Sequence, residues 1–240
     1  MIQAVIFDFN GVILDDEHLH FAMFREVLAQ DGVHITEQDY HDTYLGLDDR
    51  GCFEAALTDA GQSADSSRVD AMIARKAVRY FEEAALGLNF FPGAADCLAG
   101  LARRWPLAIN SGALRPEIEF ALKLIDRREQ ILAIVSAEET SRCKPDPEGY
   151  VLSLGKLQAE GRSALRPEHC VVIEDSLAGI QSAKGAGMWA VGVPNTYQTQ
   201  ELLDAGADDV VPSLVEFTPD WIAGRFEAWA KKAAEAGVTR

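Results

Sequence analysis

Short runs of consecutive apolar residues alternate along the chain with longer segments of helical periodicity. The first run, Ala4 to Phe9, ends in polar residues, and Asn10-Gly11 then supplies a turn. Fully buried parallel strands have this continuous apolar character. Their alternation with helices predicts an α/β fold with a doubly wound parallel sheet. The other predicted strands are 107–110, 131–135, 170–174, 189–193 and 209–211.

One interval breaks this alternation. The chain from Glu17 to Leu86 has helical periodicity and contains no convincing buried strand. We therefore predict a small α-helical cap domain at 17–86, inserted into an α/β core formed by 1–16 and 87–240. The acidic residues just before Glu17 and the glycine and proline residues from Gly87 onward mark the two crossings, which we expect to be hinges.

The tail from Pro219 to Arg240 has the periodicity of an amphipathic helix. Its aromatic and aliphatic residues recur at spacings that place them on one face. We expect this face to cover the sheet. Its members are Trp221, Ile222, Phe226 and Trp229.

Composition and charge narrow the class of partner. The chain has 240 residues, 48% of them hydrophobic, which suits a globular protein with a sizeable core. The formal net charge is -16. Nucleic acids and anionic membranes would be repelled at long range, so we expect neither as a partner. An anionic substrate must instead be attracted by local positive charge.

The cysteines and the first residues indicate the compartment. No C-x-x-C pair occurs, so the sequence suggests neither a disulfide framework nor a zinc site. The N-terminus lacks the basic charge and apolar stretch of a signal peptide, and no apolar run approaches the roughly 20 residues that span a bilayer. We expect a cytoplasmic protein with reduced thiols. The cysteines are Cys52, Cys97, Cys143 and Cys170.

Polar side chains that could carry chemistry follow several predicted strands. Ligands of open parallel sheets bind beyond the carboxyl ends of the strands. Taken singly, an acid at a strand end is often a helix cap, Ser-Gly is a turn and Lys-Pro starts a helix. Their joint order is harder to obtain by chance. The groups are Asp8, Asn110-Ser111-Gly112, Lys144-Pro145 and Glu174-Asp175-Ser176.

Together these groups make chemical sense as a phosphoryl-transfer site. Asp8 can attack phosphorus and form an aspartyl phosphate. A carboxylate and a phosphate repel each other, so a hard cation with oxygen ligands must bridge them, and Glu174 and Asp175 supply further carboxylates. Mg²⁺ is the natural cofactor. Ser111 and nearby backbone amides can bind the phosphate, while Lys144 neutralises Asp8 and the transferred oxygens.

Four motifs resemble those of haloacid dehalogenase-like hydrolases, and the match spans nearly the whole chain. The resemblance implies a Rossmann-like core, Asp8 as the nucleophile, and Ser111 and Lys144 as phosphate-binding residues. It also implies Mg²⁺ held by Asp8, Glu174, Asp175 and the backbone carbonyl of position 10. We predict Lys144 and Asn10 as catalytic positions with Asp8, and Asn110 and Gly112 as substrate-binding residues beside Ser111. The motifs are V-I-F-D-F-N-G-V (5–12), N-S-G (110–112), K-P-D-P (144–147) and V-I-E-D-S-L-A-G (172–179).

The helical cap resembles that of the subgroup containing beta-phosphoglucomutase, phosphoglycolate phosphatase and sugar-phosphate phosphatases. Within it, the stretch from Asp15 to His20 is similar to the hinge, and Gly46 to Arg50 is similar to the substrate loop. The resemblance therefore implies His20 and Arg50 as substrate-binding residues. A solvated surface arginine and a packed histidine are the alternatives for these two positions.

Position 10 departs from the family pattern. Family phosphatases place a second aspartate there, which protonates the leaving oxygen and later activates water, but this chain has Asn10. An amide cannot titrate, and general acid/base catalysis is typically worth about 10² to 10⁴ in rate. Metal binding should survive, because every residue type has a backbone carbonyl.

Three interpretations of Asn10 follow. A neighbouring acid or base can compensate, with Asp16, Glu17 and His20 as candidates. Turnover can be weak, leaving a phosphate-binding member of the family. The chemistry can also differ, as in relatives that cleave phosphorus–carbon bonds with a cap lysine, but nothing in the sequence around Lys76, the only cap lysine, suggests a desolvated amine.

We therefore predict a magnesium-dependent phosphatase of a small phosphomonoester, such as a sugar phosphate or a phosphoglycolate-like compound. The cap would close over the substrate and exclude water. A phosphomutase, which returns the phosphate to a second hydroxyl of the sugar, is the alternative within enzymes. We expect a monomer or a weak homodimer.

Overall fold

The computed structural model describes residues 1–235, and in it the chain forms two compact units. One unit comprises Met1–Ile13 together with the chain from Phe90 onward, and the other comprises Leu14–Asn89. The sequence placed the boundaries at 16/17 and 86/87, three residues inside the second unit at each end. We call the first unit the core and the second the cap.

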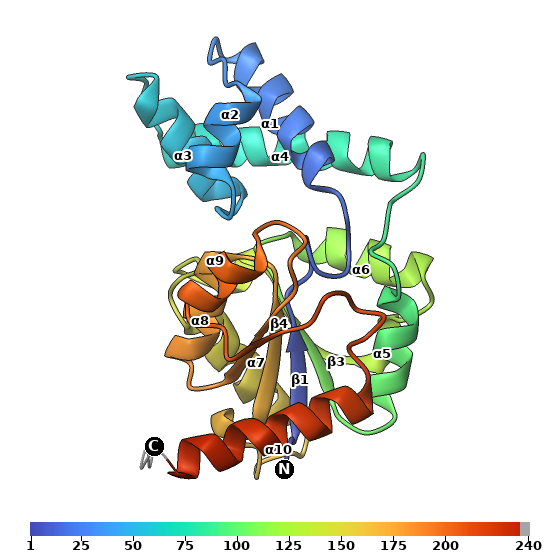
Figure 1. Cartoon of the computed structure of the whole chain (residues 1–240). Coiled ribbons are helices and arrows are strands. Elements are labelled where there is room, and N and C mark those ends of the chain that lie inside the picture. The colour runs from blue at the N-terminus through green and yellow to red at the C-terminus, as the bar shows by residue number, and fades with distance from the viewer. Residues whose placement is uncertain (236–240) are drawn as a thin grey trace. The chain divides into compact units, whose positions relative to one another are not determined.

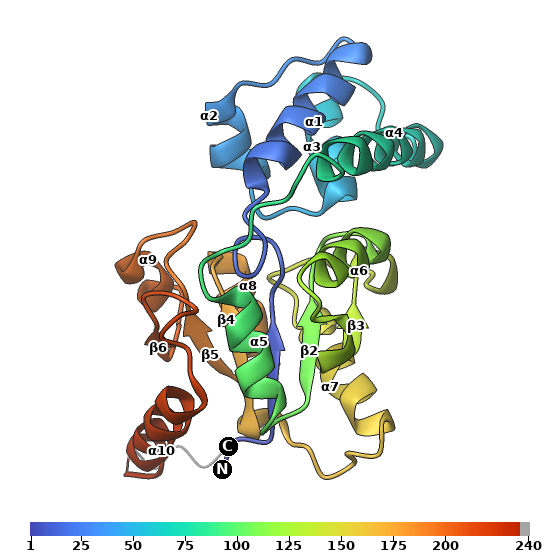
Figure 2. The same ribbon diagram turned by 90° about the vertical axis from the view of Figure 1, so that its right-hand side faces the viewer.

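The core contains a six-stranded sheet in which every pairing is parallel, with strand order β3-β2-β1-β4-β5-β6 (Figures 1 and 2). This is the order of a Rossmann-like doubly wound sheet. The predicted fold class is therefore confirmed. The strands are β1 (Ala4–Phe7), β2 (Leu107–Asn110), β3 (Ile131–Val135), β4 (Cys170–Glu174), β5 (Trp189–Gly192) and β6 (Asp209–Val210).

Helices cover both faces of the sheet. On one face α7 and α8 bury Tyr150, Leu157 and Ile180 against alternate residues of the central strands. On the other face, the rings of α10 pack on Trp189, which stacks with Trp221 and lies edge-on to Phe226. The core helices are α5 (Ala94–Ala102), α6 (Arg115–Leu124), α7 (Glu148–Ala159), α8 (Leu177–Gly185), α9 (Thr199–Asp204) and α10 (Pro219–Glu235).

The cap is helical, with a hydrophobic centre of its own. Phe24, Val27, Leu28, Phe53 and Met72 are buried together in it. These side chains recur at helical spacing, which explains why the segment folds as packed helices. The cap helices are α1 (Glu17–Gln30), α2 (Glu37–Asp39), α3 (Asp49–Asp59) and α4 (Ser66–Ala84), with a π-helical turn at Tyr40–Tyr44.

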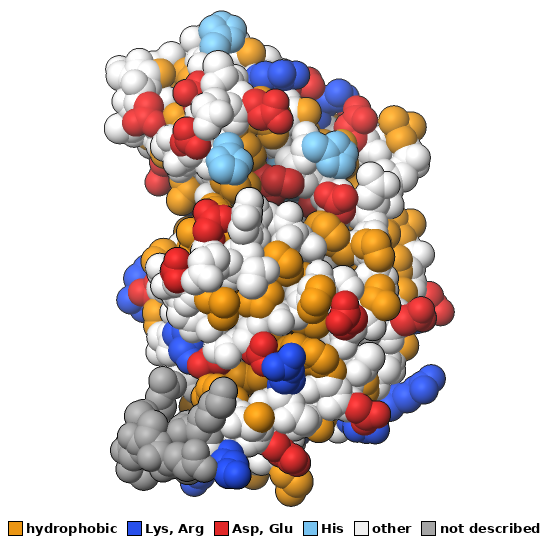
Figure 3. Space-filling model, viewed as in Figure 1, with side chains coloured by type: hydrophobic (Ala, Val, Ile, Leu, Met, Phe, Trp, Pro, Cys, Tyr) orange, Lys and Arg blue, Asp and Glu red, His pale blue; other side chains and the backbone are white. Residues whose placement is uncertain are grey.

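The surface carries both signs of charge. On the face drawn in Figure 3, acidic and basic side chains are interspersed. Among residues 1–235, none of the helices combines the length and the apolar character that crossing a bilayer requires.

Candidate active site

The strands of the core bring the predicted catalytic groups to one edge of the sheet. Asp8 directly follows β1, which lies between β2 and β4. Ser111 follows β2, while Glu174 ends β4 and Asp175 comes next. Because parallel strands end at the same edge, residues far apart in sequence meet there. The backbone N–H of Asp8 donates to the carbonyl oxygen of Ile173 at 3.0 Å, which extends the pairing of β1 with β4 by one residue.

Asp8, Glu174 and Asp175 form a buried acidic cluster. Each offers one carboxylate oxygen, and these atoms lie within 4.8 Å of one another. Lys144, from the loop before α7, is the ammonium in this cluster. Its Nζ lies 2.7 Å from Asp8 Oδ1 and 2.5 Å from Glu174 Oε1. Three carboxylates thus share one ammonium.

Burial and crowding of like charges alter the pKa values in the cluster. Burial, aided by Glu174 and opposed by Lys144, raises the pKa of Asp8 to about 7. The pKa of Asp175 is raised well above its ordinary value by burial and by the two neighbouring carboxylates. Burial alone would lower the pKa of Lys144, but Asp8 and Glu174 raise it above its usual range. When its three carboxylates are ionised, the cluster therefore has more negative charge than the single Lys144 ammonium can balance.

The donor set fits a magnesium ion. Hard divalent cations of this kind prefer carboxylate and carbonyl oxygens, which are the atoms gathered here. A cation would also supply the charge that the cluster lacks. Asp8, Asp175 and Glu174 are the residues that would hold it, with the backbone carbonyl of Asn10.

Glu174 is held by a full set of protein donors. Its Oε1 accepts from Lys144 and from the Tyr150 hydroxyl at 2.7 Å, and its Oε2 accepts from the backbone N–H and hydroxyl of Ser176. A Cβ on Gly179 would lie 1.9 Å from the carboxyl carbon of Glu174, so only glycine fits at that position of α8. Tyr150 was not predicted as a site residue, because a buried tyrosine on a helix carries no chemical signal in the sequence.

Ser111, in the segment after β2, is hydrogen-bonded to Asn10. The Ser111 hydroxyl donates to Asn10 Oδ1 at 3.2 Å and accepts from the backbone N–H of Ala113 at 3.0 Å. Asn110 is buried, with 3% of its surface exposed, and Gly112 is exposed. The structure thus brings Ser111 and Asn10 together, while the roles assigned to Asn110 and Gly112 in substrate binding stay predictions.

The cap contains a second buried polar cluster. His20 Nε2 lies 3.2 Å from Asp16 Oδ2, and Lys76 Nζ lies 2.8 Å from His20 Nδ1 and 2.6 Å from Asp49 Oδ1. Tyr80 donates its hydroxyl proton to Asp16 at 3.1 Å. The sequence-based view that Lys76 is not desolvated is wrong, because its side chain is completely buried. The partners that surround the Lys76 ammonium, His20 and Asp49, are distant from it in sequence, so the residues next to Lys76 give no sign of its burial.

Arg50 lies outside this polar cluster. Its side chain is 44% exposed and pairs with Asp70 and Glu54 on the surface of the cap. Its predicted contact with a substrate stays a prediction.

Comparison with known proteins supports the assignment of the motifs. Residues 5–193 match the description "Haloacid dehalogenase-like hydrolase". The chain belongs to this family. The hydrolase is 31% identical over 210 residues to a phosphorylated carbohydrates phosphatase of Thermotoga maritima, with 86% of this chain and 92% of that protein covered. It is 28% identical to the beta-phosphoglucomutase of Bacillus subtilis, covering 95% of this chain and 97% of that protein.

A solved structure agrees with these relatives. The crystal structure of CbbY from Rhodobacter sphaeroides in complex with phosphate superimposes on the hydrolase with a TM-score of 0.78 at 27% identity. The match covers 90% of this chain and 96% of that one. The fold and the family are thus established, and the roles of individual site residues are inferred from the geometry above.

Proposed function

We propose that this hydrolase is a magnesium-dependent phosphatase of a small phosphorylated metabolite, working through an aspartyl phosphate on Asp8. The observation that carries the proposal is the buried contact of Lys144 with both Asp8 and Glu174, next to Asp175. This arrangement presents a nucleophilic carboxylate within a cation-binding set. Similarity to phosphatases of phosphorylated carbohydrates favours a sugar phosphate as the substrate.

The first half-reaction transfers the phosphoryl group to the protein. A carboxylate oxygen of Asp8 forms a bond to phosphorus as the ester P–O bond breaks, and the leaving alkoxide takes up a proton from water. Lys144 balances negative charge on Asp8 and on the transferred oxygens, and Ser111 donates a hydrogen bond to the phosphate. When bound, Mg²⁺ supplies positive charge between the carboxylates and the phosphate. Water then attacks phosphorus, releasing phosphate and regenerating Asp8.

Asn10 limits the proton transfers in both halves. Its amide neither gives a proton to the alkoxide nor takes one from water. We infer that turnover is slow, with Asp16, Glu17 or His20 as the candidates for partial compensation. Asp16 and His20 are hydrogen-bonded to each other in the cap, and Glu17 accepts a hydrogen bond from the Tyr40 hydroxyl.

Two other functions are alternatives to this proposal. A phosphomutase would return the phosphoryl group to a second hydroxyl of the sugar, and the similarity to beta-phosphoglucomutase motivates this alternative. A phosphate-binding protein with negligible turnover is motivated by Asn10. The first would give an isomerised sugar phosphate, and the second a single burst of product without turnover.

Phosphate release and product analysis test the proposal. The parent chain, Asn10→Asp and Asp8→Ala would be incubated with Mg²⁺ and a panel of hexose, pentose and hexitol phosphates. We expect slow release by the parent, release faster by about 10² to 10⁴ in Asn10→Asp, and none in Asp8→Ala. The double variant Asp8→Ala/Asn10→Asp is the control and should be silent.

Other results would redirect the assignment. Equal rates for the parent and Asn10→Asp would mean that another group already performs the proton transfers, and Asp16, Glu17 and His20 would be replaced in turn. Isomerised sugar phosphate without net release of phosphate would favour the phosphomutase. Silence of Asn10→Asp across the panel would overturn the phosphatase proposal.

A further inference from the structure

The loop that follows β5 reaches the acidic cluster with two side chains to which the catalytic scheme gives no role. Asn195 donates from Nδ2 to the carbonyl oxygen of Gly11 at 2.7 Å. Thr196 donates its hydroxyl proton to Asp175 Oδ2. Both contacts lie within the core, and both join segments that are more than 20 residues apart in sequence.

The two acceptors belong to the segments that would hold the cation. Gly11 follows Asn10, whose backbone carbonyl is one expected ligand, and Asp175 is another. These segments are also packed tightly against each other. A Cβ on Gly11 would lie 2.0 Å from Asp175 Oδ2, and Gly11 has a φ of +77°. The oxygen that accepts from Thr196 is therefore the nearer of the two Asp175 oxygens to Gly11, since the same Cβ would lie 2.9 Å from Oδ1.

The two carboxylate oxygens of Asp175 therefore have different surroundings. Oδ2 is occupied by the Thr196 hydroxyl and covered by Gly11, which leaves Oδ1 as the oxygen that can face a cation. Asp175 is 4% exposed, so water contributes little to its orientation. A neutral hydroxyl donor can orient a carboxylate without adding a charge that would compete with the ion.

The neighbouring carboxylate is held differently. Glu174 accepts from the Lys144 ammonium, whereas the only side-chain donor recorded for Asp175 among residues 1–235 is Thr196. Asp175 also experiences repulsion from Asp8 and Glu174. Loss of the Thr196 hydroxyl would therefore free Asp175 to rotate away from the position that binds a cation.

We propose that Thr196, assisted by Asn195, is a positioning residue of the magnesium site, which fixes Asp175 so that one oxygen is presented to the ion. This inference rests on the magnesium site of the proposed function. It assigns a role in cation affinity to the β5 loop. The role is one of positioning, because Thr196 acts through Asp175.

The test is direct titration of the whole chain with Mg²⁺ by calorimetry, without substrate. Thr196→Val keeps the shape of the side chain and removes the donor, while Thr196→Ser keeps the donor. We expect Thr196→Val to weaken Mg²⁺ binding about 10- to 100-fold, the range typical for loss of an outer-shell partner of a metal ligand. Thr196→Ser should stay within about threefold of the parent.

A second readout separates positioning from general damage. In Asn10→Asp, which provides measurable turnover, Thr196→Val should raise the Mg²⁺ concentration needed for half-maximal rate and leave the rate at saturating Mg²⁺ nearly unchanged. If Thr196→Val is poorly folded, Asn195→Ala serves as the second variant, because Asn195 is exposed and the substitution removes the side-chain hydrogen bond to Gly11. It should weaken Mg²⁺ binding less than Thr196→Val does.

The possible results distinguish failure of the positioning role from failure of the proposed function. Parental Mg²⁺ affinity in both Thr196→Val and Asn195→Ala would overturn the positioning role and leave the proposed function intact. Absence of Mg²⁺ binding by the parent would overturn both. Equal weakening in Thr196→Val and Thr196→Ser would also contradict the role, because the serine variant retains the hydroxyl.

Discussion

At the scale of single residues, the protonation of Asp8 predicts that Mg²⁺ affinity depends on pH. Burial raises the pKa of Asp8 to about 7, so below that pH the ion-free protein holds a proton there. A bound cation requires the ionised form, and binding must then release the proton. We expect Mg²⁺ affinity to increase as the pH rises toward 7, by up to about tenfold per pH unit for each proton released, and the raised pKa of Asp175 adds to this release.

Calorimetry in buffers with different ionisation enthalpies measures this proton release. At a pH below 7 the apparent binding enthalpy of the parent should change with the buffer. Asp8→Asn, which cannot release a proton at that position, should release fewer protons for each ion bound. A binding enthalpy that is independent of the buffer at acidic pH would contradict the prediction.

Site residues that belong to a recognisable motif could be predicted from the sequence. Residues that reach the site only through the direction of their side chains could not. Asp8, Glu174 and Asp175 could be predicted to meet because strand ends in a parallel sheet converge, whereas Lys144 was marked by its motif in the loop before α7. Tyr150 and Thr196 touch the same cluster, but their contacts depend on side-chain directions that no motif encodes. Lys76 was misjudged for a related reason.

At the scale of elements, the cap depends on an ion pair between α3 and α4. Lys76 is fully buried on α4, and Asp49 at the start of α3 lies 2.6 Å from it. Removal of one partner from a buried pair leaves a charge without its compensation and typically costs about 3–5 kcal/mol. We expect Asp49→Ala to destabilise the cap by about 3 kcal/mol and to increase hydrogen exchange in α3 and α4.

The neighbouring residue provides the matched control. Arg50→Ala removes an exposed ion pair from the same turn of α3 and should cost less than about 1 kcal/mol. The double variant Asp49→Ala/Lys76→Met removes both buried charges and should recover most of the loss. Similar exchange rates in Asp49→Ala and Arg50→Ala would show that the buried pair does not stabilise the cap.

Strand positions were more predictable than strand ends. The runs at 107–110, 131–135 and 170–174 coincide with β2, β3 and β4, because these strands are apolar throughout except for the terminal residues Asn110 and Glu174. The first strand ends at Phe7 and not at Phe9, and one further hydrogen bond joins Asp8 to β4 before the chain turns at Gly11. The predicted apolar face of the last helix does cover the sheet, up to the limit of the described residues.

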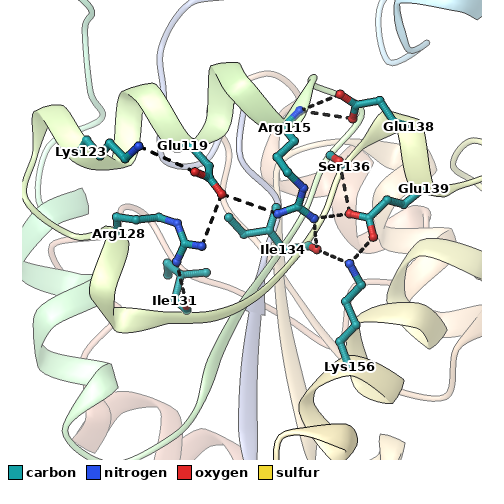
Figure 4. Close-up of polar contacts among 10 residues, drawn as sticks. All are labelled: Arg115, Glu119, Lys123, Arg128, Ile131, Ile134, Ser136, Glu138, Glu139 and Lys156. Atoms are coloured by element: carbon teal, nitrogen blue, oxygen red, sulfur yellow. Dashed lines mark hydrogen bonds and ion pairs between the residues drawn. The ribbon is translucent and has the colours of Figure 1, made fainter.

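At the scale of the whole molecule, we expect the β3 edge of the sheet to be protected against pairing with a second copy. β3 is an edge strand, and three basic side chains donate hydrogen bonds to the carbonyl oxygens of two of its residues (Figure 4). Arg115 and Lys156 donate to the carbonyl oxygen of Ile134 at 2.8 and 2.7 Å, and Arg128 donates to that of Ile131 at 3.1 Å. Glu139 pairs with both Arg115 and Lys156 and holds them in place. The carbonyls are thus unavailable to a strand from a second copy.

Removing these donors should promote association between copies. In Arg115→Ala/Lys156→Ala the Ile134 carbonyl loses both partners, and pairing with another chain would satisfy it. Sedimentation should show a larger dimer fraction than in the parent at equal concentration. The control Lys123→Ala/Arg166→Ala removes the same charge from side chains that are 67% and 68% exposed. Both pairs make the net charge more negative and increase repulsion, so association in the first pair alone would identify the edge as the cause. Equal sedimentation of both double variants and the parent would mean that the basic side chains do not prevent association at the β3 edge.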